Sequence, residues 1–209
     1  MLHVDMDNEG MKNILNNWIP KFDRSIPFQG HVFGGWNTDV KRITDEVGQA
    51  DFMMVPRSTG YIKQSGDSLA GPPVIVYNHR KVRPGKMEAM LAAQQAYADY
   101  MYKHVPGVIA ITAGVDDQDP LLVHDLQVFA NFDVFLGHAD MNNLEVKKLF
   151  TDWINFDLYD DSHPFHGEVW APADNVNRVK RMTRELGRAM FTIYPIEEIQ
   201  GDVNFNNWE

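Results

Sequence analysis

A short phrase occurs twice in this chain, once near each end. Residues 22–33 read FDRSIPFQGHVF, and residues 159–170 read YDDSHPFHGEVW. Both follow one pattern: aromatic, Asp, any residue, Ser, any residue, Pro, Phe, any residue, Gly, any residue, Val, aromatic. Self-similarity of this kind indicates a repeated structural unit. We therefore expect the shared letters to serve the architecture, and the letters that differ, together with the unrepeated centre, to carry function.

The similarity extends on both sides of the phrase. Upstream, MKNILNNWI (11–19) matches VKKLFTDWI (146–154), and downstream residues 40–56 match residues 179–195. Each copy reads as a helix, an alternating strand, a helix with apolar residues at helical spacing, and a second strand that a proline is expected to stop. We predict internally duplicated α-βαβ units at both ends of the chain, over 11–62 and 156–201. The polar, Gly- and Pro-rich segment 63–73 is the predicted linker.

The central segment, 74–155, has a different order of elements. A strand over 74–82, a turn at Pro84–Gly85 and a long amphipathic helix over 86–104 come first. Strands over 108–115 and 121–130 follow, and then a helix or a broken pair of helices over 132–154. Together with the first strand of the second copy, the order is β-α-β-β-α-β. That order predicts a ferredoxin-like α+β sandwich.

Composition excludes several classes of protein. The chain has no cysteine, which rules out disulfides, thiolate metal sites and a cysteine nucleophile. Its net charge of −10, without a basic patch, argues against a nucleic-acid partner. No apolar run approaches the length of a membrane span, and the acidic start is not a signal peptide, so we expect a soluble, cytoplasmic protein.

Chemical motifs are equally scarce. The sequence has no dinucleotide fingerprint, no P-loop and no nucleophile elbow. His163 and His166 flank a proline beside two aspartates, but no metal-ligand pattern supports them, and we expect no metal site.

The centre resembles a known family. The stretch VIVYNHRKVRPGKMEAM, followed by VPGVIAITAGVDDQDPLLVHDLQVFANFDVFLGHAD, is similar to an antibiotic biosynthesis monooxygenase (ABM) domain of the dimeric α+β barrel superfamily. The resemblance covers roughly 73–155 and rests on the order and spacing of loose motifs. It implies paired ferredoxin-like units whose sheets form a barrel, and a hydrophobic pocket between sheet and helices. Family members include cofactor-free oxygenases of quinol-like aromatics, haem-degrading oxygenases and proteins without known chemistry.

The haem-degrading branch fits poorly. Its members carry an Asn on the first strand, a Trp at the end of the third strand and a His late in the second helix. Asn78 matches the first feature, but Phe129 stands at the Trp position and the His position falls near Lys148. Haem is therefore disfavoured, and we expect no cofactor.

Strand alternation selects candidate site residues. Asn78 and Arg80 share one face of the first central strand, and Asp125, Gln127 and Phe129 share one face of the third. The Leu and Val face of the third strand is expected to pack on helices, which would leave the polar face for a small molecule. His138, three residues after Phe135, is the expected general base because its pKa lies near neutrality. The catalytic candidates are thus His138 and Asn78, and the substrate-binding candidates are Asp125, Gln127, Phe129, Trp170 and Arg80.

Each candidate has a structural alternative. Asn78 fits a satisfied hydrogen bond on an exposed sheet face, His138 a partly buried helix histidine, and Trp170 the core. The functional hypothesis is an ABM-like oxygenase, without metal or flavin, acting on an aromatic or polyketide-like small molecule. The alternatives are a polyketide cyclase or isomerase of the same barrel, which would turn over without oxygen, and a non-catalytic small-ligand-binding protein. We expect a homodimer, and the alternative is that the two repeats pair within one chain.

Overall fold

The computed structural model describes residues 28–34, 50–62, 72–163, 165–185 and 189–196. The chain divides into two compact units, residues 1–56 and residues 57–209. In the first unit, β1 (Phe28–Gly34) pairs in parallel with the first half of β2 (Ala50–Ile62), and Gly30 lies opposite Phe52. The helices predicted over 11–19 and 40–48 and the linker 63–71 lie outside the described residues.

Proline 56 does not stop its strand as predicted. β2 continues to Ile62, and it changes partner at this residue. Residues up to Pro56 pair with β1, and residues from Arg57 pair antiparallel with β4. Proline lacks only its own N–H group, so a strand can run through it where the ladder does not need that donor.

The second unit is built on a ferredoxin-like sheet. It contains β3 (Val74–Lys81), α3 (Met87–His104), β4 (Val108–Val115), β5 (Leu122–Phe129), α4 (Phe132–His138), α5 (Leu144–Trp153) and β6 (His166–Pro172). The order across the sheet is β4-β5-β3-β6, with every neighbouring pair antiparallel. The second half of β2 extends the sheet beyond β4, and β7 (Met190–Ile196) extends it beyond β6. The predicted α+β fold is confirmed.

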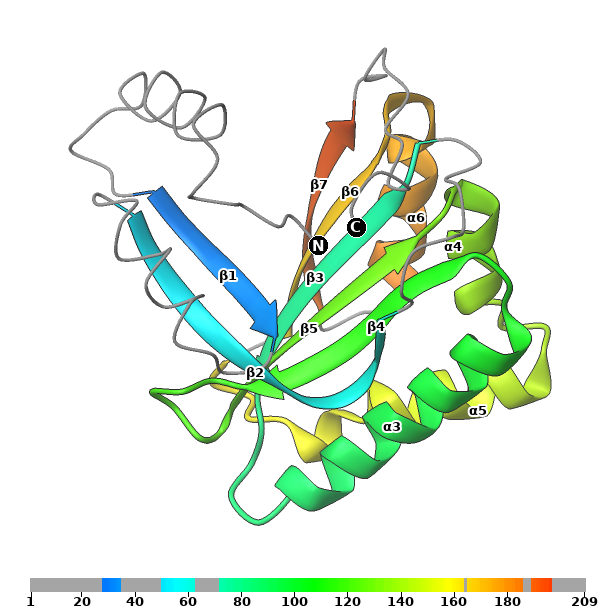
Figure 1. Cartoon of the computed structure of the whole chain (residues 1–209). Helices are drawn as coiled ribbons and strands as arrows, with labels where there is room; N and C mark the ends of the chain where they lie inside the picture. Colours follow the sequence, from blue (N-terminus) through cyan, green and yellow to red (C-terminus); the bar gives the residue numbers. More distant parts are fainter. Residues whose placement is uncertain (1–27, 35–49, 63–71, 164, 186–188, 197–209) are drawn as a thin grey trace, which may run out of the picture. The chain divides into compact units, whose positions relative to one another are not determined.

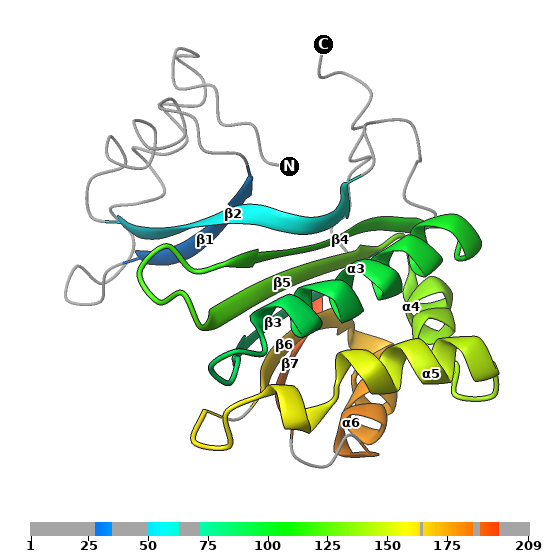
Figure 2. The ribbon, with the colours of Figure 1, turned by 90° about the horizontal axis from the view of Figure 1, so that it is seen from below.

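Helices cover one face of this sheet (Figure 2). α3 and α5 pack against each other, and α6 (Val176–Glu185) connects β6 to β7. Short 3₁₀ turns occupy Phe156–Leu158 and Ala173–Asn175. The predicted helix over 132–154 is a broken pair, and a separate N-cap explains the break. Asn131 caps α4, and the Asn143 side chain accepts hydrogen bonds from the backbone N–H groups of Glu145 and Val146 at the start of α5.

Strands β6 and β7 form a parallel pair whose register repeats that of β1 and β2. Gly167 lies opposite Phe191, as Gly30 lies opposite Phe52. A Cβ atom on Gly167 would overlap the Phe191 ring and would lie 2.6 Å from Asn78 Oδ1. The repeated glycine thus leaves room for an aromatic ring from the neighbouring strand. This matching register is what a duplication would produce, and the duplication itself stays a prediction.

The assignment of the sheet faces requires a correction. Val123, Asp125, Gln127 and Phe129 are buried and face the helices, because Val123 packs with Met90 of α3 and Phe129 with Phe135 of α4. Leu122, Leu126 and Val128, which the sequence assigned to the helices, are only half-buried on the opposite face. Apolar content alone misled the assignment, because Asp125 is paired on the buried face with Arg80 and with the amide N–H groups of Asn78 and Gln127.

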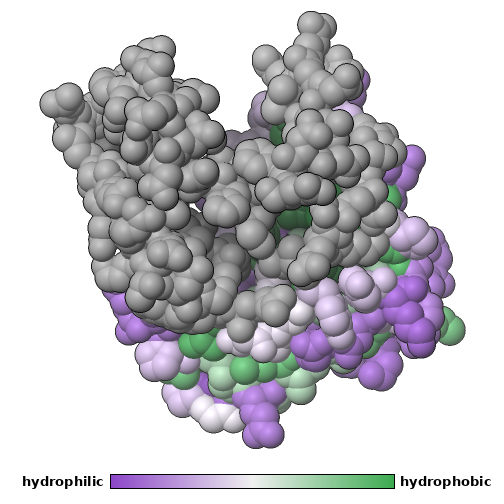
Figure 3. Space-filling model, in the orientation of Figure 1, coloured by the Kyte–Doolittle hydropathy of each residue, from purple (hydrophilic) through white to green (hydrophobic). Residues whose placement is uncertain are grey.

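Among the described residues, no helix is long and apolar enough to cross a membrane. On the face shown in Figure 3, hydrophilic and hydrophobic residues alternate over the described part of the surface.

Candidate functional site

A cavity of about 870 Å³ lies between the helix-facing side of the sheet and helices α5 and α6. Its wall is mostly aromatic and aliphatic. The residues that contribute most to this wall are Val76, Phe135, Phe150, Trp153, Phe156, Phe165, Val169, Met182 and Phe191. A volume of this size suits a small molecule of several rings.

Polar side chains interrupt the apolar wall at several places. Thr151, Asp152, Asn155, Asp157 and Thr183 are exposed or half-buried, and the other three are Asn78 of β3, Gln127 of β5 and His138 of α4. All three are almost fully buried. The pairing of β3 with β5, in which Asn78 faces Asp125 and Val76 faces Gln127, brings the two amides together. The predicted convergence of Asn78, Gln127 and His138 on one pocket is therefore present in the structure.

Beneath the amides lies Asp125, which is fully buried. Its Oδ1 atom accepts hydrogen bonds from Asn78 Nδ2 at 2.8 Å and from Gln127 Nε2 at 3.1 Å. Its Oδ2 atom pairs with the guanidinium of Arg80, which is also fully buried. A buried charge requires a partner of this kind, because removal from water is otherwise too costly.

The guanidinium of Arg80 is held from several sides. Its Nη2 donates to Gln94 Oε1 of α3 at 3.1 Å. The rings of Trp153, Tyr159 and Phe165 surround it at 5.1 to 5.4 Å from their centroids. Arg80 and Asp125 therefore form a support beneath the cavity and do not themselves line it.

His138 is a neutral imidazole at pH 7. Burial lowers its pKa to about 4, although the hydrogen bond to the backbone carbonyl of Phe135 acts in the opposite direction. Its Nδ1–H donates to that carbonyl, which fixes the tautomer and leaves Nε2 as an acceptor. The rings of Phe129 and Phe135 lie 4.6 and 4.7 Å from the imidazole and account for the burial.

Four of the predicted substrate-binding residues lie elsewhere. Arg80, Asp125 and Phe129 are packed behind the cavity wall. Trp170 is half-buried on the opposite face of the sheet, where its ring stacks on Tyr194 at 5.2 Å. Of that set, Gln127 alone lines the cavity.

The sequence reasoning missed the aromatic wall. Trp153, Phe165 and Phe191 line the cavity, and each has an identical counterpart in the first copy: Trp18, Phe28 and Phe52. Trp153 and Phe165 belong to the buried core, and Phe191 packs against it, as expected of letters that serve the architecture. A comparison of the two copies could have identified these residues, because aromatic residues repeated at a sheet–helix interface are candidates for a cavity wall.

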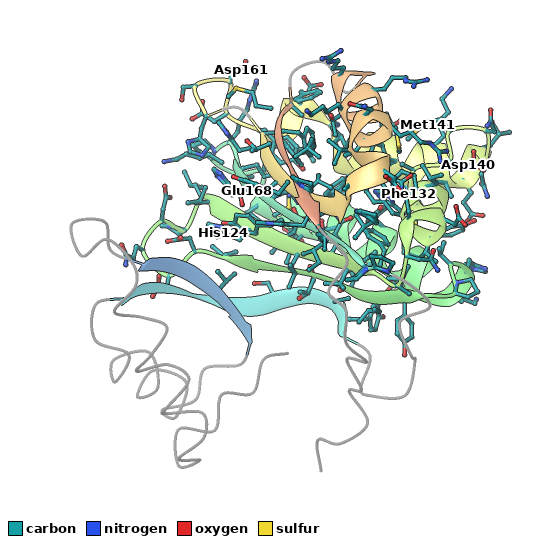
Figure 4. All side chains as sticks on the ribbon, turned by 90° about the horizontal axis from the view of Figure 1, so that it is seen from above. His124, Phe132, Asp140, Met141, Asp161 and Glu168 are labelled. Carbon is teal, nitrogen blue, oxygen red and sulfur yellow. The ribbon has the colours of Figure 1, made fainter. Side chains whose placement is uncertain are left out.

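The opposite face of the sheet carries a second polar group, built around a row of histidines. The Tyr77 hydroxyl bonds to His124 Nδ1 at 2.6 Å, and His124 Nε2 bonds to Asp116 Oδ2 at 2.9 Å. Burial, and then the charge of Asp125, raises the pKa of Tyr77. In Figure 4, the side chain of His124 projects from β5 and that of Glu168 from β6. Met141 is also labelled there and lies in the segment between α4 and α5.

His79 lies between His124 and His166 in this row. Its ring centroid is 6.2 Å from that of His124 and 5.1 Å from that of His166. Within the described ranges, no group of His, Asp or Glu has the arrangement of a metal site.

Lys148 does not fit the role of an iron ligand. It is exposed on α5, and its ammonium pairs with Asp152 at 2.9 Å, one helical turn away. Among the described residues that line the cavity, the histidine is His138. A haem iron in this cavity would therefore need His138 Nε2 as its protein ligand.

No family model and no curated protein matches the chain. Among solved structures, the chain is similar to MupZ from Pseudomonas fluorescens, with 14% identity over 62% of this chain and 93% of MupZ, at a TM-score of 0.46. It is also similar to a protein from Chloroflexus aurantiacus J-10-fl described as a "putative Antibiotic biosynthesis monooxygenase", with 15% identity over 46% of this chain and 90% of that one, at a TM-score of 0.36. The family that the sequence resembles is thus represented among these structures. Similarity at this level does not specify an activity.

Proposed function

We propose that the chain is an ABM-like oxygenase that acts on an aromatic or polyketide-like small molecule, without metal or flavin. The observation that carries the proposal is the convergence of three buried side chains, Asn78, Gln127 and His138, on one aromatic-walled cavity. A few fixed polar groups in an apolar cavity are typical of small-molecule sites. Asp125 and Arg80 serve in this proposal as positioning residues, since they hold the two amides and do not reach the cavity.

The reaction balances without a cofactor for a phenolic ring. The ring carries one hydroxyl and one hydrogen at the carbon to be oxidised, and it reacts with O₂ to give a quinone and water. One oxygen atom becomes the new carbonyl oxygen, and the other leaves as water with the hydroxyl hydrogen and the ring hydrogen. All the electrons that reduce O₂ come from the substrate.

In this reaction His138 accepts the hydroxyl proton. Because its pKa is near 4, it is a weak base toward an unoxidised phenol. The proton therefore moves as electrons leave the ring, when the hydroxyl becomes strongly acidic. Until then, His138 Nε2 accepts a hydrogen bond from the hydroxyl and orients the ring.

Oxygen uptake with a phenolic substrate tests the proposal. We expect the wild-type chain to consume O₂ and to place one atom of ¹⁸O₂ in the quinone. His138→Ala should reduce the rate by roughly 10²-fold or more, as is usual for the loss of a positioned acid–base group. Lys103→Ala, which changes an exposed residue of α3 that does not line the cavity, is the control. Unchanged uptake in His138→Ala would remove His138 from the mechanism.

The low pKa of His138 also favours a second candidate, a non-catalytic binding protein. A base this weak accepts hydrogen bonds from a ligand but does not readily abstract a proton. Retention of an aromatic ligand without turnover, in air and under nitrogen, would support this candidate. Turnover under nitrogen would instead indicate a cyclase or isomerase.

Absence of haem is part of the proposal and has its own test. Haem is added to the purified chain and the Soret band is followed. We expect no shift beyond that of free haem. A strong shift that disappears in His138→Ala would show iron bound through that imidazole.

We also propose that the protein forms a homodimer through the sheet face that none of the described helices covers. Half-buried Ile75, Trp170, Leu126 and Val128 lie on that face. Sedimentation equilibrium should then give twice the chain mass of 23.9 kDa. A monomer at micromolar concentration would contradict this part of the proposal.

A further inference from the structure

The orientation of the two cavity amides is fixed by the carboxylate of Asp125. An ionised carboxylate only accepts hydrogen bonds, so the groups that face it have to be N–H donors. Asn78 Nδ2 and Gln127 Nε2 both donate to Asp125 Oδ1, at 2.8 and 3.1 Å. Arg80 forms an ion pair with this carboxylate, and both side chains are fully buried. A flip of either amide would place a carbonyl oxygen against the carboxylate, which is unfavourable.

The same orientation leaves both carbonyl oxygens without a donor. Asn78 Oδ1 and Gln127 Oε1 are buried and have no hydrogen-bond partner in the described part of the chain. Both residues line the cavity, and each is about 1% exposed. Buried polar atoms are rarely left unsatisfied in folded proteins, so a pair of them beside one cavity points to a partner that enters from outside.

His138 adds a third acceptor to the same cavity. Its Nδ1–H is used by the Phe135 carbonyl, and Nε2 therefore carries a lone pair. The polar side of the cavity thus presents acceptors from Asn78, Gln127 and His138. The carboxylates of Asp152 and Asp157, which also line the cavity, disfavour an anionic ligand.

We propose that the cavity selects its ligand by hydrogen-bond polarity: it binds a neutral aromatic ring bearing hydroxyl or N–H donors, and it rejects the corresponding ring with carbonyl or ether oxygens. The inference rests on the proposed function insofar as it places the substrate in this cavity. The inference also gives a physical reason for the release of the oxidised product. Oxidation of a ring hydroxyl to a carbonyl replaces a donor with an acceptor, which then faces the side of the cavity that presents the acceptors of His138, Asn78 and Gln127. The site therefore holds the reduced ring and releases the quinone.

A matched set of probes tests this selection without any turnover. The full chain is titrated calorimetrically under nitrogen with 1,5-dihydroxynaphthalene, 1,5-dimethoxynaphthalene and 1,4-naphthoquinone. The diol and the ether carry oxygens at the same two positions and differ in whether those oxygens donate. The quinone carries two carbonyl oxygens on the same carbon skeleton. We expect the diol to bind roughly 10- to 100-fold more tightly than the ether or the quinone, because a site built to accept from a hydroxyl discriminates strongly against analogues that lack it.

Variants assign the effect to the acceptors. Gln127→Met keeps the length of the side chain and removes its acceptor, so the ratio of diol to ether affinity should fall at least about threefold. Lys103→Ala, at an exposed residue outside the cavity lining, should leave the ratio unchanged. Should Gln127→Met fold poorly, Asn78→Leu serves as the second variant, with the same expected direction.

The outcomes separate the two proposals. Equal affinity for diol and ether in the wild-type chain overturns the polarity inference and leaves the oxygenase proposal standing. An unchanged ratio in both Gln127→Met and Asn78→Leu overturns the assignment to these acceptors. Failure of every probe to bind, in a chain that still consumes O₂ with a phenol, overturns the inference by placing the substrate elsewhere. Failure of both binding and uptake overturns the proposed function as well.

Discussion

The carboxylate of Asp125 meets the guanidinium of Arg80 at the interface of sheet and helices, and neither side chain is exposed to solvent. The pair links β5 to β3, and through the amides of Asn78 and Gln127 it orients the polar wall of the cavity. A buried ion pair contributes little net stability by itself, but the loss of one partner leaves the other charge buried and unpaired.

Asp125→Ala should therefore destabilise the fold strongly. We expect a loss of roughly 3–5 kcal/mol in the free energy of unfolding, measured by urea titration followed by circular dichroism. The control is Lys148→Ala, which breaks the exposed pair with Asp152 and should change the urea midpoint little. A mild effect of Asp125→Ala would show that Arg80 finds another counter-charge.

Much of the architecture was accessible from the sequence, because local patterns decide it. Strand alternation, the helical spacing of 86–104 and the Pro84–Gly85 turn gave the element order, and that order gave the sheet topology. Both copies carry a Pro at the end of a strand pattern, yet β2 runs through Pro56 and β7 includes Pro195. A proline ends a strand only where the neighbouring strand needs its backbone N–H as a hydrogen-bond donor. The sequence of the strand itself does not show where that is.

The site was accessible only in part. Strand alternation selected Asn78 and Gln127, although it assigned the face of Gln127 away from the helices, and the spacing from Phe135 selected His138. Arg80 and Asp125 are on the same faces, but they pair with each other. This pairing could not be predicted, because it depends on the register between β3 and β5, which are far apart in the sequence. Trp170 was chosen because it differs between the copies, and parity alone did not say that its face lies away from the helices.

Gly167→Ala should destabilise the second unit. The new methyl group would overlap the Phe191 ring and crowd Asn78 Oδ1. Overpacking of this kind costs about 1–3 kcal/mol, and thermal denaturation should show it as a lower midpoint. The combination with Phe191→Leu should recover part of the loss. Gly137→Ala in helix α4 is the control, since a Cβ atom at Gly137 would meet only the side chain of Val105, at 3.9 Å.

The same substitution at Gly30 tests the duplication. Gly30 opposes Phe52 in the register in which Gly167 opposes Phe191. If the copies are equivalent, Gly30→Ala should lower the thermal midpoint in the same direction. A fully tolerated Gly30→Ala would contradict the equivalence.

Asn143→Ala should weaken the helix that supplies Phe150 and Trp153 to the cavity. The Asn143 side chain accepts from the backbone N–H groups of Glu145 at 3.0 Å and Val146 at 3.2 Å. Removal of such a cap costs about 1 kcal/mol, and hydrogen exchange should rise at the first turn of α5. Asn142→Ala, one residue earlier and exposed, is the control and should leave the exchange unchanged.

Acidification should destabilise the fold through His138. Its pKa is about 4 in the folded chain and 6.5 in the absence of burial, so between these values the unfolded chain takes up a proton that the folded chain does not. Stability is therefore fully present above about pH 6.5 and is lost as the pH falls toward 4, by on the order of 3 kcal/mol in total. His138→Gln removes this titration and keeps a polar side chain. The difference in unfolding free energy between His138→Gln and wild type should thus shift in favour of the variant as the pH falls from 7 to 4, while other titrating groups cancel. A pH-independent difference would show that His138 takes up its proton equally well in the folded and unfolded chains, and that its imidazole is open to water.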